Sequence, residues 1–285
     1  TTAMRSFVQA LVRRKIALAG ALVLLLILAM AILAPLVSPY DPMDLDPLVR
    51  LQGPSGTHWF GTDHFGRDIF SRVVYGARLT MVSGLGVVIY SVILGVLIGM
   101  LSGYFRRVGF VVMRLVDVVM SFPPLLLALA LLAILGAGLS NVILAVGVTY
   151  LTRTSRIIFG LTLKLKEESF IEATRSLGSN SLRILSRHIL PNLLSPVIVQ
   201  ATFTFAFSLL NMAALDFLGV GVPPQIPSWG NMISEGRVYI TRAPGVLLFP
   251  GIFIVLTVLS FNLVGDVLRD KLDPRFRDQF SGVRR

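Results

Sequence analysis

Residues 172–191 read EATRSLGSNSLRILSRHILP, a short, polar and basic stretch between two long apolar runs. Just before it, Ser169 and Glu172 fit a capping box that would begin a helix. Four positions spaced at i, i+3, i+4 and i+7 would form one face of that helix: Phe170, Ala173, Thr174 and Leu177. Gly178 is placed to end the helix in the left-handed conformation that glycine adopts readily. A loop that needed only to be solvated would not require this organisation.

A second helix is expected to begin at Asn180 or Ser181, with Leu182, Leu185 and Ile189 on one side. Pro191 then falls in the first turn of the next apolar run, where its missing N–H is tolerated. The stretch therefore predicts a helix–turn–helix beside a membrane, shaped to enter a groove on a partner protein. The alternative is a basic amphipathic hairpin that lies on anionic lipid.

The overall composition is that of a membrane protein. Hydrophobic residues make up 54% of the chain, charged residues only 14%, and the mean hydropathy is +0.79, unlike a soluble domain. Uncharged runs recur that are long enough for a helix of about 20 residues to cross a bilayer. We expect an all-α integral membrane protein with six transmembrane helices, near residues 17–38, 79–103, 112–135, 141–163, 189–215 and 246–268.

The basic residues give the orientation of the predicted helices. Twenty of the 26, Arg153 and Arg156 among them, fall in segments assigned to the side that holds the N-terminus. This positive-inside bias predicts that both termini and residues 172–191 are cytoplasmic, and it explains the net charge of +11 without nucleic acid. The predicted parts are a cytoplasmic N-terminus (1–16), a first transmembrane helix (17–38), an external segment (39–78), a five-helix core (79–268) with a cytoplasmic loop (164–188), and a cytoplasmic tail (269–285).

Signals for processing or catalysis are weak. The first apolar run is longer than the core of a signal peptide and no cleavage site follows it, so we expect a retained helix. The chain has no cysteine, which excludes disulfides and thiolate chemistry. Residues 61–66 have the glycine spacing of a phosphate loop, but Arg67-Asp68 stands where Lys-Ser/Thr is required. We expect no catalytic residue and no bound cofactor.

A metal site is also not expected. His58, Asp63 and His64 lie close together in the external segment and have the side chains that bind metals. Imidazoles in loops are more often ordinary polar groups, so we predict no metal at these residues.

Two patterns lie inside the predicted helices. Glycines repeat every fourth residue at Gly95, Gly99 and Gly103, which favours close helix packing, within one subunit or against a related permease rather than at a homodimer face. Polar residues share one face of the fifth helix: Gln200, Thr204, Ser208 and Asn211. Because polar groups in hydrocarbon need partners or water, these side chains either line a translocation path or bond to a neighbouring helix.

Three single residues also have expected roles. Asp117 is three residues from Arg114, a spacing that permits a local ion pair. Trp229 is suited to anchor the chain at the membrane interface. The role of Asp216, a carboxylate near the end of a predicted helix, stays open.

Residues 172–191 resemble the EAA loop of ABC-transporter permeases. Five positions match its pattern, namely Glu172, Ala173, Gly178, Leu190 and Pro191. Thr174 replaces the second alanine and His188 replaces an isoleucine. HWFGTD at 58–63 and GRD at 66–68 resemble a segment common in the peptide and nickel importer branch of these permeases. Blocks within 214–237 and 261–275 are similar to the second permease of dipeptide and oligopeptide importers.

The resemblance implies a type I ABC importer permease (MetI-like) fold in the bacterial cytoplasmic (inner) membrane. It implies a homologous second permease, two cytoplasmic ATPases that use ATP and Mg, an external solute-binding protein, and transport of di- or oligopeptides. The residues implied to dock on an ATPase are Glu172, Ala173, Thr174, Leu177, Gly178, Leu190 and Pro191. The alternatives are an importer of nickel or another small solute and, from a different class, an ion-coupled secondary transporter.

Overall fold

The fold is described for residues 14–272 of a computed structural model. These residues are largely helical and contain no β-strand, only an isolated bridge between Thr62 and Asp68. Most of the predicted cytoplasmic N-terminus (1–16) and tail (269–285) lies outside the described residues.

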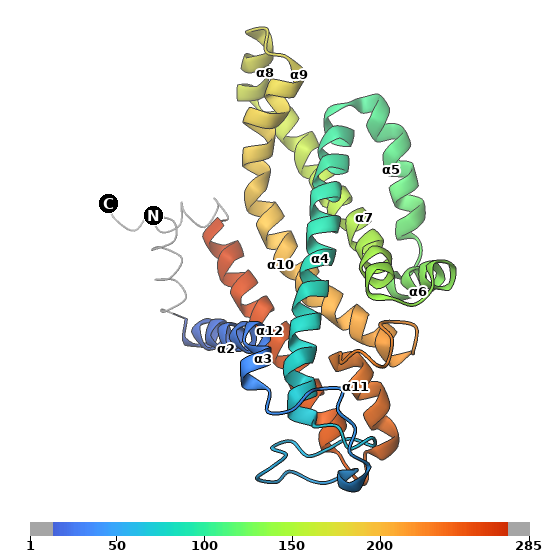
Figure 1. The fold of residues 1–285 in the computed structure, drawn as a ribbon. Helices are drawn as coiled ribbons and strands as arrows, with labels where there is room; N and C mark the ends of the chain where they lie inside the picture. The colour runs from blue at the N-terminus through green and yellow to red at the C-terminus, as the bar shows by residue number, and fades with distance from the viewer. Residues whose placement is uncertain (1–13, 273–285) are drawn as a thin grey trace.

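Eleven α-helices follow one another along the described chain (Figure 1). They are α2 (Lys15–Ile32), α3 (Ala34–Val37), α4 (Ile69–Tyr104), α5 (Arg106–Met120), α6 (Pro124–Leu135), α7 (Leu139–Lys166), α8 (Ser169–Ser176), α9 (Ser181–Ile184), α10 (Leu190–Phe217), α11 (Trp229–Gly236) and α12 (Gly245–Leu272). Short 3-10 turns occupy Pro47–Val49 and Arg237–Tyr239, and a π-helical turn, Leu185–Ile189, joins α9 to α10. Five helices in the described chain are long and apolar enough to cross a membrane, or six if α5 and α6 form one broken span.

The third predicted helix, 112–135, is not one straight helix. α5 and α6 meet at an angle of 94°. Pro123 and Pro124 explain the break: proline cannot donate a backbone hydrogen bond, and it disfavours helical geometry in the residue before it. The two prolines lie inside the uncharged run that begins at Val118, so the absence of charge there gave no sign of the break.

The second predicted helix begins earlier than expected. α4 starts at Ile69 rather than at residue 79, and Asp68 caps it by accepting a hydrogen bond of 2.7 Å from the backbone N–H of Ser71. Arg72 and Arg78, which interrupt the uncharged run in the sequence, lie within this helix. The irregular part of the predicted external segment therefore ends at Asp68.

The glycine stripe packs α4 against α7, as predicted for contact within one subunit. A Cβ atom on Gly95 would lie 2.7 Å from the Cβ of Thr154, and one on Gly103 would lie 2.6 Å from the Cβ of Thr162. Because glycine has no side chain beyond a hydrogen atom, the two helix backbones can approach closely, which is how helices associate in lipid.

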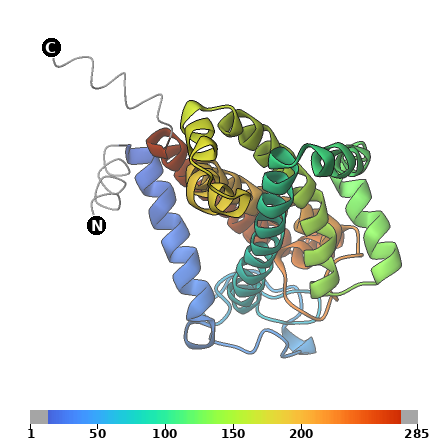
Figure 2. The same ribbon diagram turned by 90° about the horizontal axis from the view of Figure 1, so that it is seen from above.

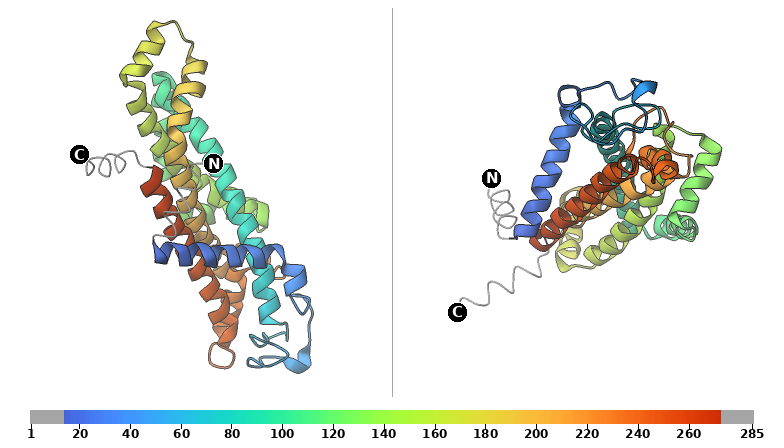
Figure 3. Two further views of the ribbon diagram at one scale, coloured as in Figure 1. Left: turned by 90° about the vertical axis from the view of Figure 1, so that its left-hand side faces the viewer. Right: turned by 90° about the horizontal axis from the view of Figure 1, so that it is seen from below.

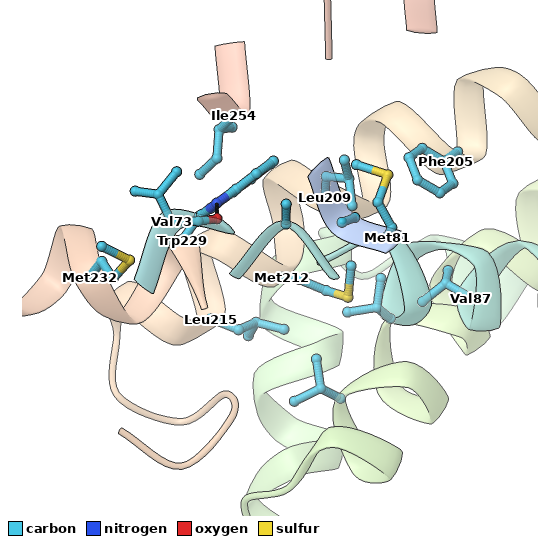
Figure 4. Close-up of a cluster of buried hydrophobic side chains, with 14 of the residues drawn as sticks. Val73, Met81, Val87, Phe205, Leu209, Met212, Leu215, Trp229, Met232 and Ile254 are labelled. Carbon is cyan, nitrogen blue, oxygen red and sulfur yellow. Dashed lines mark hydrogen bonds between the residues drawn. The ribbon is translucent and has the colours of Figure 1, made fainter. Parts of the chain in front are cut away.

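Trp229 lies in the largest buried apolar cluster, with residues of α4, α10 and α12 (Figure 4). Its side chain is 1% exposed, and its Nε1 donates a hydrogen bond of 2.9 Å to the carbonyl of Val73. The predicted interfacial anchor is therefore wrong: the polar atom of this indole bonds to a neighbouring helix instead of to the membrane surface.

The molecule has two distinct ends. α8 and α9 project together at one end, whereas α11 and the irregular segment before α4 lie at the other (Figure 1). From above, α2 lies along one edge and α5 with α6 along the opposite edge (Figure 2). α2 runs across the long helices rather than beside them (Figure 3). Its first turn meets the last turns of α12, where Arg14 and Asp270 form an ion pair of 2.7 Å.

Candidate functional site

The projecting hairpin (residues 168–189) consists of α8, a tight turn, α9 and the π-helical turn. Gly178 has φ +79°, the left-handed conformation that the sequence predicts. The N–H of Gly178 donates to the carbonyl of Arg175, and that of Ser179 donates to the carbonyl of Thr174. This pair of bonds is a Schellman motif, which satisfies the last carbonyls of a helix.

The two ends of the turn are fixed by different groups. Asn180 caps α9 by accepting a 2.9 Å hydrogen bond from the N–H of Arg183, as expected. The predicted capping box at Ser169 does not form, since Glu168 is the N-cap residue and no side chain bonds there. The backbone carbonyl of Glu168 accepts the N–H of Ile171 instead.

The hairpin has one buried face and one exposed face. Ile171, Ile184, Leu185 and Ile189 are buried in a second apolar cluster with residues of α4 and α7. Leu177 is 86% exposed and Leu182 is 74% exposed. The expectation that Leu182 shares a side with Leu185 and Ile189 is therefore wrong. Large apolar side chains that point into solvent are typical of a docking surface.

The base of the hairpin is tied to α4 at Tyr104. The Nζ atom of Lys166 donates a 2.7 Å hydrogen bond to the backbone carbonyl of Tyr104 and lies 5.5 Å from the centre of its ring. The guanidinium of Arg175 lies 6.0 Å from the same ring centre. Lys166 is the last residue of α7, so its bond joins α7 to α4 at the base of the hairpin, while Arg175 and the apolar cluster pack the hairpin itself against these helices.

The predicted coupling residues mostly lie on the free surface. Glu172, Ala173, Leu177, Gly178 and Pro191 are exposed, whereas Thr174 and Leu190 are half-buried. Glu172 and Arg175 also line a cavity of about 670 Å³ that lies between the hairpin and helices α4, α5 and α7. The exposed residues are available for contact with a partner.

The polar face of α10 is divided between two roles. Gln200 and Thr204 line a cavity of about 220 Å³, and the Gln200 Nε2 atom lies 3.3 Å from the Thr204 hydroxyl. Ser208 is buried and donates to the carbonyl of Phe205. Asn211 donates a 2.6 Å hydrogen bond to the hydroxyl of Tyr150 on α7. Both alternatives left open by the sequence therefore have support, at different residues.

Sequence reasoning missed two residues of this cavity, Tyr150 and Arg153. Arg153 was assigned to the inner side with the basic residues of the cytoplasmic loop. In the structure it lies within α7, fourteen residues after Leu139 and thirteen before Lys166. The sequence did contain a signal for this position, because Arg153 falls inside the predicted helix at 141–163.

At the end opposite the hairpin, two arginines join the segment before α4 and the first turn of α4 to α11. Arg67 Nε lies 2.6 Å from Asp63 and its Nη2 lies 2.7 Å from Glu235. Arg72 contacts the same two carboxylates, at 3.3 and 3.4 Å. Asp63, His64 and Glu235 are close enough to hold a metal ion, but the guanidinium groups already neutralise both carboxylates.

Burial changes the pKa of two groups beside this network. It raises the pKa of Glu235, against the opposing effect of Arg67. It lowers the pKa of His64, although Asp63 and Glu235 favour the protonated form. The imidazole of His64 stacks on Tyr239, with ring centres 5.0 Å apart. Both shifts favour the neutral forms of partly buried side chains.

Asp216 holds the segment between α10 and α11. Its two carboxylate oxygens accept hydrogen bonds of 2.8 Å from the N–H of Val222 and 2.7 Å from the hydroxyl of Ser228. This buried carboxylate therefore has a structural role, which the sequence had left open.

Asp117 does not pair with Arg114 as expected. It forms an ion pair of 3.0 Å with Arg156 of α7. Arg114 instead lies 5.9 Å from the ring centre of Phe110. The ion pair links α5 to α7 rather than stabilising a single helix.

Comparison with known proteins identifies related sequences. Residues 91–278 match the family model described as "binding-protein-dependent transport system inner membrane component", and residues 2–54 match the N-terminal transmembrane domain of oligopeptide transport permease C. A dipeptide transport system permease protein of Alkalihalophilus pseudofirmus is 43% identical, over 96% of this chain and 90% of its own length. A di/tripeptide transport system permease protein of Pseudomonas aeruginosa is 42% identical, over 96% and 93%.

A glutathione transport system permease protein of Pectobacterium atrosepticum is 41% identical, over 97% of this chain and 92% of its own length. Among solved structures, a chain of the inward-facing methionine ABC transporter MetNI is similar, with a TM-score of 0.59 and 19% identity. That match covers 71% of this chain and 96% of the other, and it shows a common fold.

Proposed function

Because the chain belongs to the family of inner-membrane components of binding-protein-dependent transport systems, we propose that it forms half of the membrane channel of a peptide importer. It is an ABC permease that crosses the inner membrane several times. Family membership excludes the ion-coupled secondary transporter that the sequence left as an alternative.

The relatives support peptides over nickel as the solute. The proteins from Alkalihalophilus pseudofirmus and Pseudomonas aeruginosa are named for dipeptides and for di- and tripeptides, and the one from Pectobacterium atrosepticum for glutathione. All three names denote short peptides or a peptide-like compound. The observation that carries the proposal is identity above 40% over nearly the whole chain.

The assembly proposed for this chain has a homologous second permease, two cytoplasmic ATPases and an external solute-binding protein. The ATPases bind and hydrolyse ATP with Mg, while this chain binds no cofactor. Both termini and the hairpin are placed in the cytoplasm, in agreement with the distribution of basic residues.

The hairpin is proposed to transmit the movement of an ATPase to the helices. Its outer face, with Leu177 and Leu182, docks in a groove of the ATPase. Its inner face is packed on α4 and α7, and Arg175 lies 6.0 Å from the ring centre of Tyr104. A displacement of the hairpin therefore shifts these helices. We expect the channel to have two conformations. ATP can favour one of them only if the docked ATPases make different contacts with the two conformations.

Uptake by the complete importer tests the proposed function. The chain is reconstituted in vesicles with its second permease, ATPases and solute-binding protein, and the accumulation of labelled dipeptide and of nickel is measured. We expect accumulation of the dipeptide only, and only with ATP and every subunit present. Accumulation of nickel without peptide, or ATP-independent peptide accumulation by this chain alone, would refute the proposal.

A further inference from the structure

Arg153 is a charged residue in the middle of a transmembrane helix. At a rise of 1.5 Å per residue it lies about 20 Å from each end of α7. A hydrocarbon layer is about 30 Å thick, so this position is well inside the membrane. α7 is one of the five helices that are long and apolar enough to span it.

Within the described part of the chain, Arg153 has no hydrogen bond or ion pair, and its side chain is exposed. Arg156, one turn later, differs, because it pairs with Asp117 at 3.0 Å. An unpaired cation at membrane depth is costly, and such residues usually face a water-filled cavity and serve a ligand. Arg153 is therefore free to bind an anionic partner that does not belong to the described part of the chain.

The surroundings of Arg153 are suited to a small amphipathic ligand. It lines the cavity of about 220 Å³ with Tyr150 of α7 and with Gln200, Phe203, Thr204 and Phe207 of α10. Gln200 and Thr204 offer hydrogen-bonding groups, and the aromatic rings offer apolar surface. Among residues 14–272, no carboxylate lines this cavity, so the cation is available to an incoming anion.

We propose that Arg153 is a specificity-determining residue of the translocation path and binds the C-terminal carboxylate of the peptide. This inference rests on the proposed function, because the terminal carboxylate is the anionic group common to all unmodified peptides. The planar guanidinium pairs with a carboxylate through two parallel hydrogen bonds. The amide of Gln200 lies in the same cavity and is available to the peptide backbone.

The test compares a fluorescent dipeptide with its C-terminal amide, which differs only in lacking the negative charge. Binding of each to the complete importer in lipid nanodiscs is measured by fluorescence anisotropy, without the solute-binding protein. For the unmodified importer we expect the acid to bind about 10- to 100-fold more tightly than the amide, since hydrogen bonds between charged groups contribute that much to affinity.

Arg153→Gln is expected to abolish this difference in affinity, because it weakens the binding of the acid alone. Retained binding of the amide would show that the cavity is still folded. Arg153→Lys keeps the charge but not the paired hydrogen bonds, so it should give an intermediate ratio. If the importer with Arg153→Gln fails to assemble, the ratio of acid affinity to amide affinity measured for Arg153→Lys decides whether the inference holds. Arg156→Gln is the matched control on the same helix and should keep the original ratio.

The inference is refuted if the unmodified importer binds both forms equally or binds neither, or if Arg153→Gln keeps the preference for the acid. It is also refuted if Arg153→Gln weakens the binding of the acid and of the amide equally. That result is expected if Arg153 pairs instead with a carboxylate of the second permease. Failure of the proposed function looks different, because the vesicles would then take up neither form even with all subunits present.

Discussion

Gly178→Arg is expected to abolish peptide uptake and association with the ATPases, while the amount of chain in the membrane stays normal. Nothing lies within 4 Å of a Cβ atom built on Gly178, so the new side chain meets no clash inside the protein. The left-handed backbone adds a strain of about 1–2 kcal/mol, small against the total stability of a folded domain. The main effect is a long cation at the tip of the docking surface.

Uptake in vesicles and co-purification of the ATPases measure this effect. Gly178→Ala has the same strain without the bulk and should keep most of the uptake. Gly219→Arg is the matched control: Gly219 has φ +77° and open space around it, but it follows α10 at the opposite end from the hairpin. It should leave the ATPases bound. Normal uptake by Gly178→Arg at normal abundance would contradict the proposed role of the hairpin.

Gly99→Leu is expected to remove most of the folded chain from the membrane. A Cβ atom at this position would lie 2.5 Å from the carbonyl oxygen of Ser155 and 3.0 Å from the backbone nitrogen of Phe159. Backbone atoms cannot rotate away, so α4 and α7 would have to separate along the contact that joins them. Overpacking of an ordinary core costs about 1–3 kcal/mol, and a forced separation of two helices should cost more.

The abundance and the melting temperature of the purified chain measure this loss. Gly160→Leu is the matched control, because Gly160 is an exposed glycine on α7 with nothing within 4 Å of its Cβ position. It should leave both quantities nearly unchanged. Equal abundance and equal melting temperature for the two variants would show that the glycine stripe does not hold α4 to α7.

Several local features were predicted correctly from the sequence, although the capping box at Ser169 was not. The left-handed turn at Gly178 and the cap at Asn180 depend on a few neighbouring residues. The glycine repeat on α4 also required no knowledge of its partner, because small residues at every fourth position favour close helix packing whichever helix supplies the other side.

Features that depend on distant contacts were missed. Trp229 has the composition of an interfacial residue, and only the contact with Val73, 156 positions away, shows that it is buried. Arg156 rather than Arg114 pairs with Asp117 because α5 packs beside α7. The break at Pro123 is different: its signal, two adjacent prolines, is local, but it lies inside a long uncharged run that predicts a continuous helix.

The polar face of α10 was predicted only in part. The spacing of Gln200, Thr204, Ser208 and Asn211 was enough to place them on one side of a helix. The sequence could not say which of them meet a cavity and which meet another helix, since Tyr150 and Arg153 come from α7. The assignment of Arg153 to a cytoplasmic segment concealed the most informative charge in the membrane region.

Site-directed cross-linking tests the role of the hairpin most directly. The chain has no cysteine, so Leu177→Cys or Leu182→Cys places a single thiol on the exposed hairpin face. Leu48→Cys is the control, since Leu48 is 91% exposed and lies in the segment before α4, at the other end of the molecule. A reagent that attaches to this thiol and carries a photoactivated group, which can insert into any neighbouring side chain, is added to the complete importer and irradiated with and without ATP.

We expect both hairpin thiols to cross-link to an ATPase subunit, with a yield that changes when ATP is added, and the thiol at position 48 to give no such product. Cross-linking from position 48 as efficient as from positions 177 and 182, or no ATPase product from the hairpin, would contradict the account.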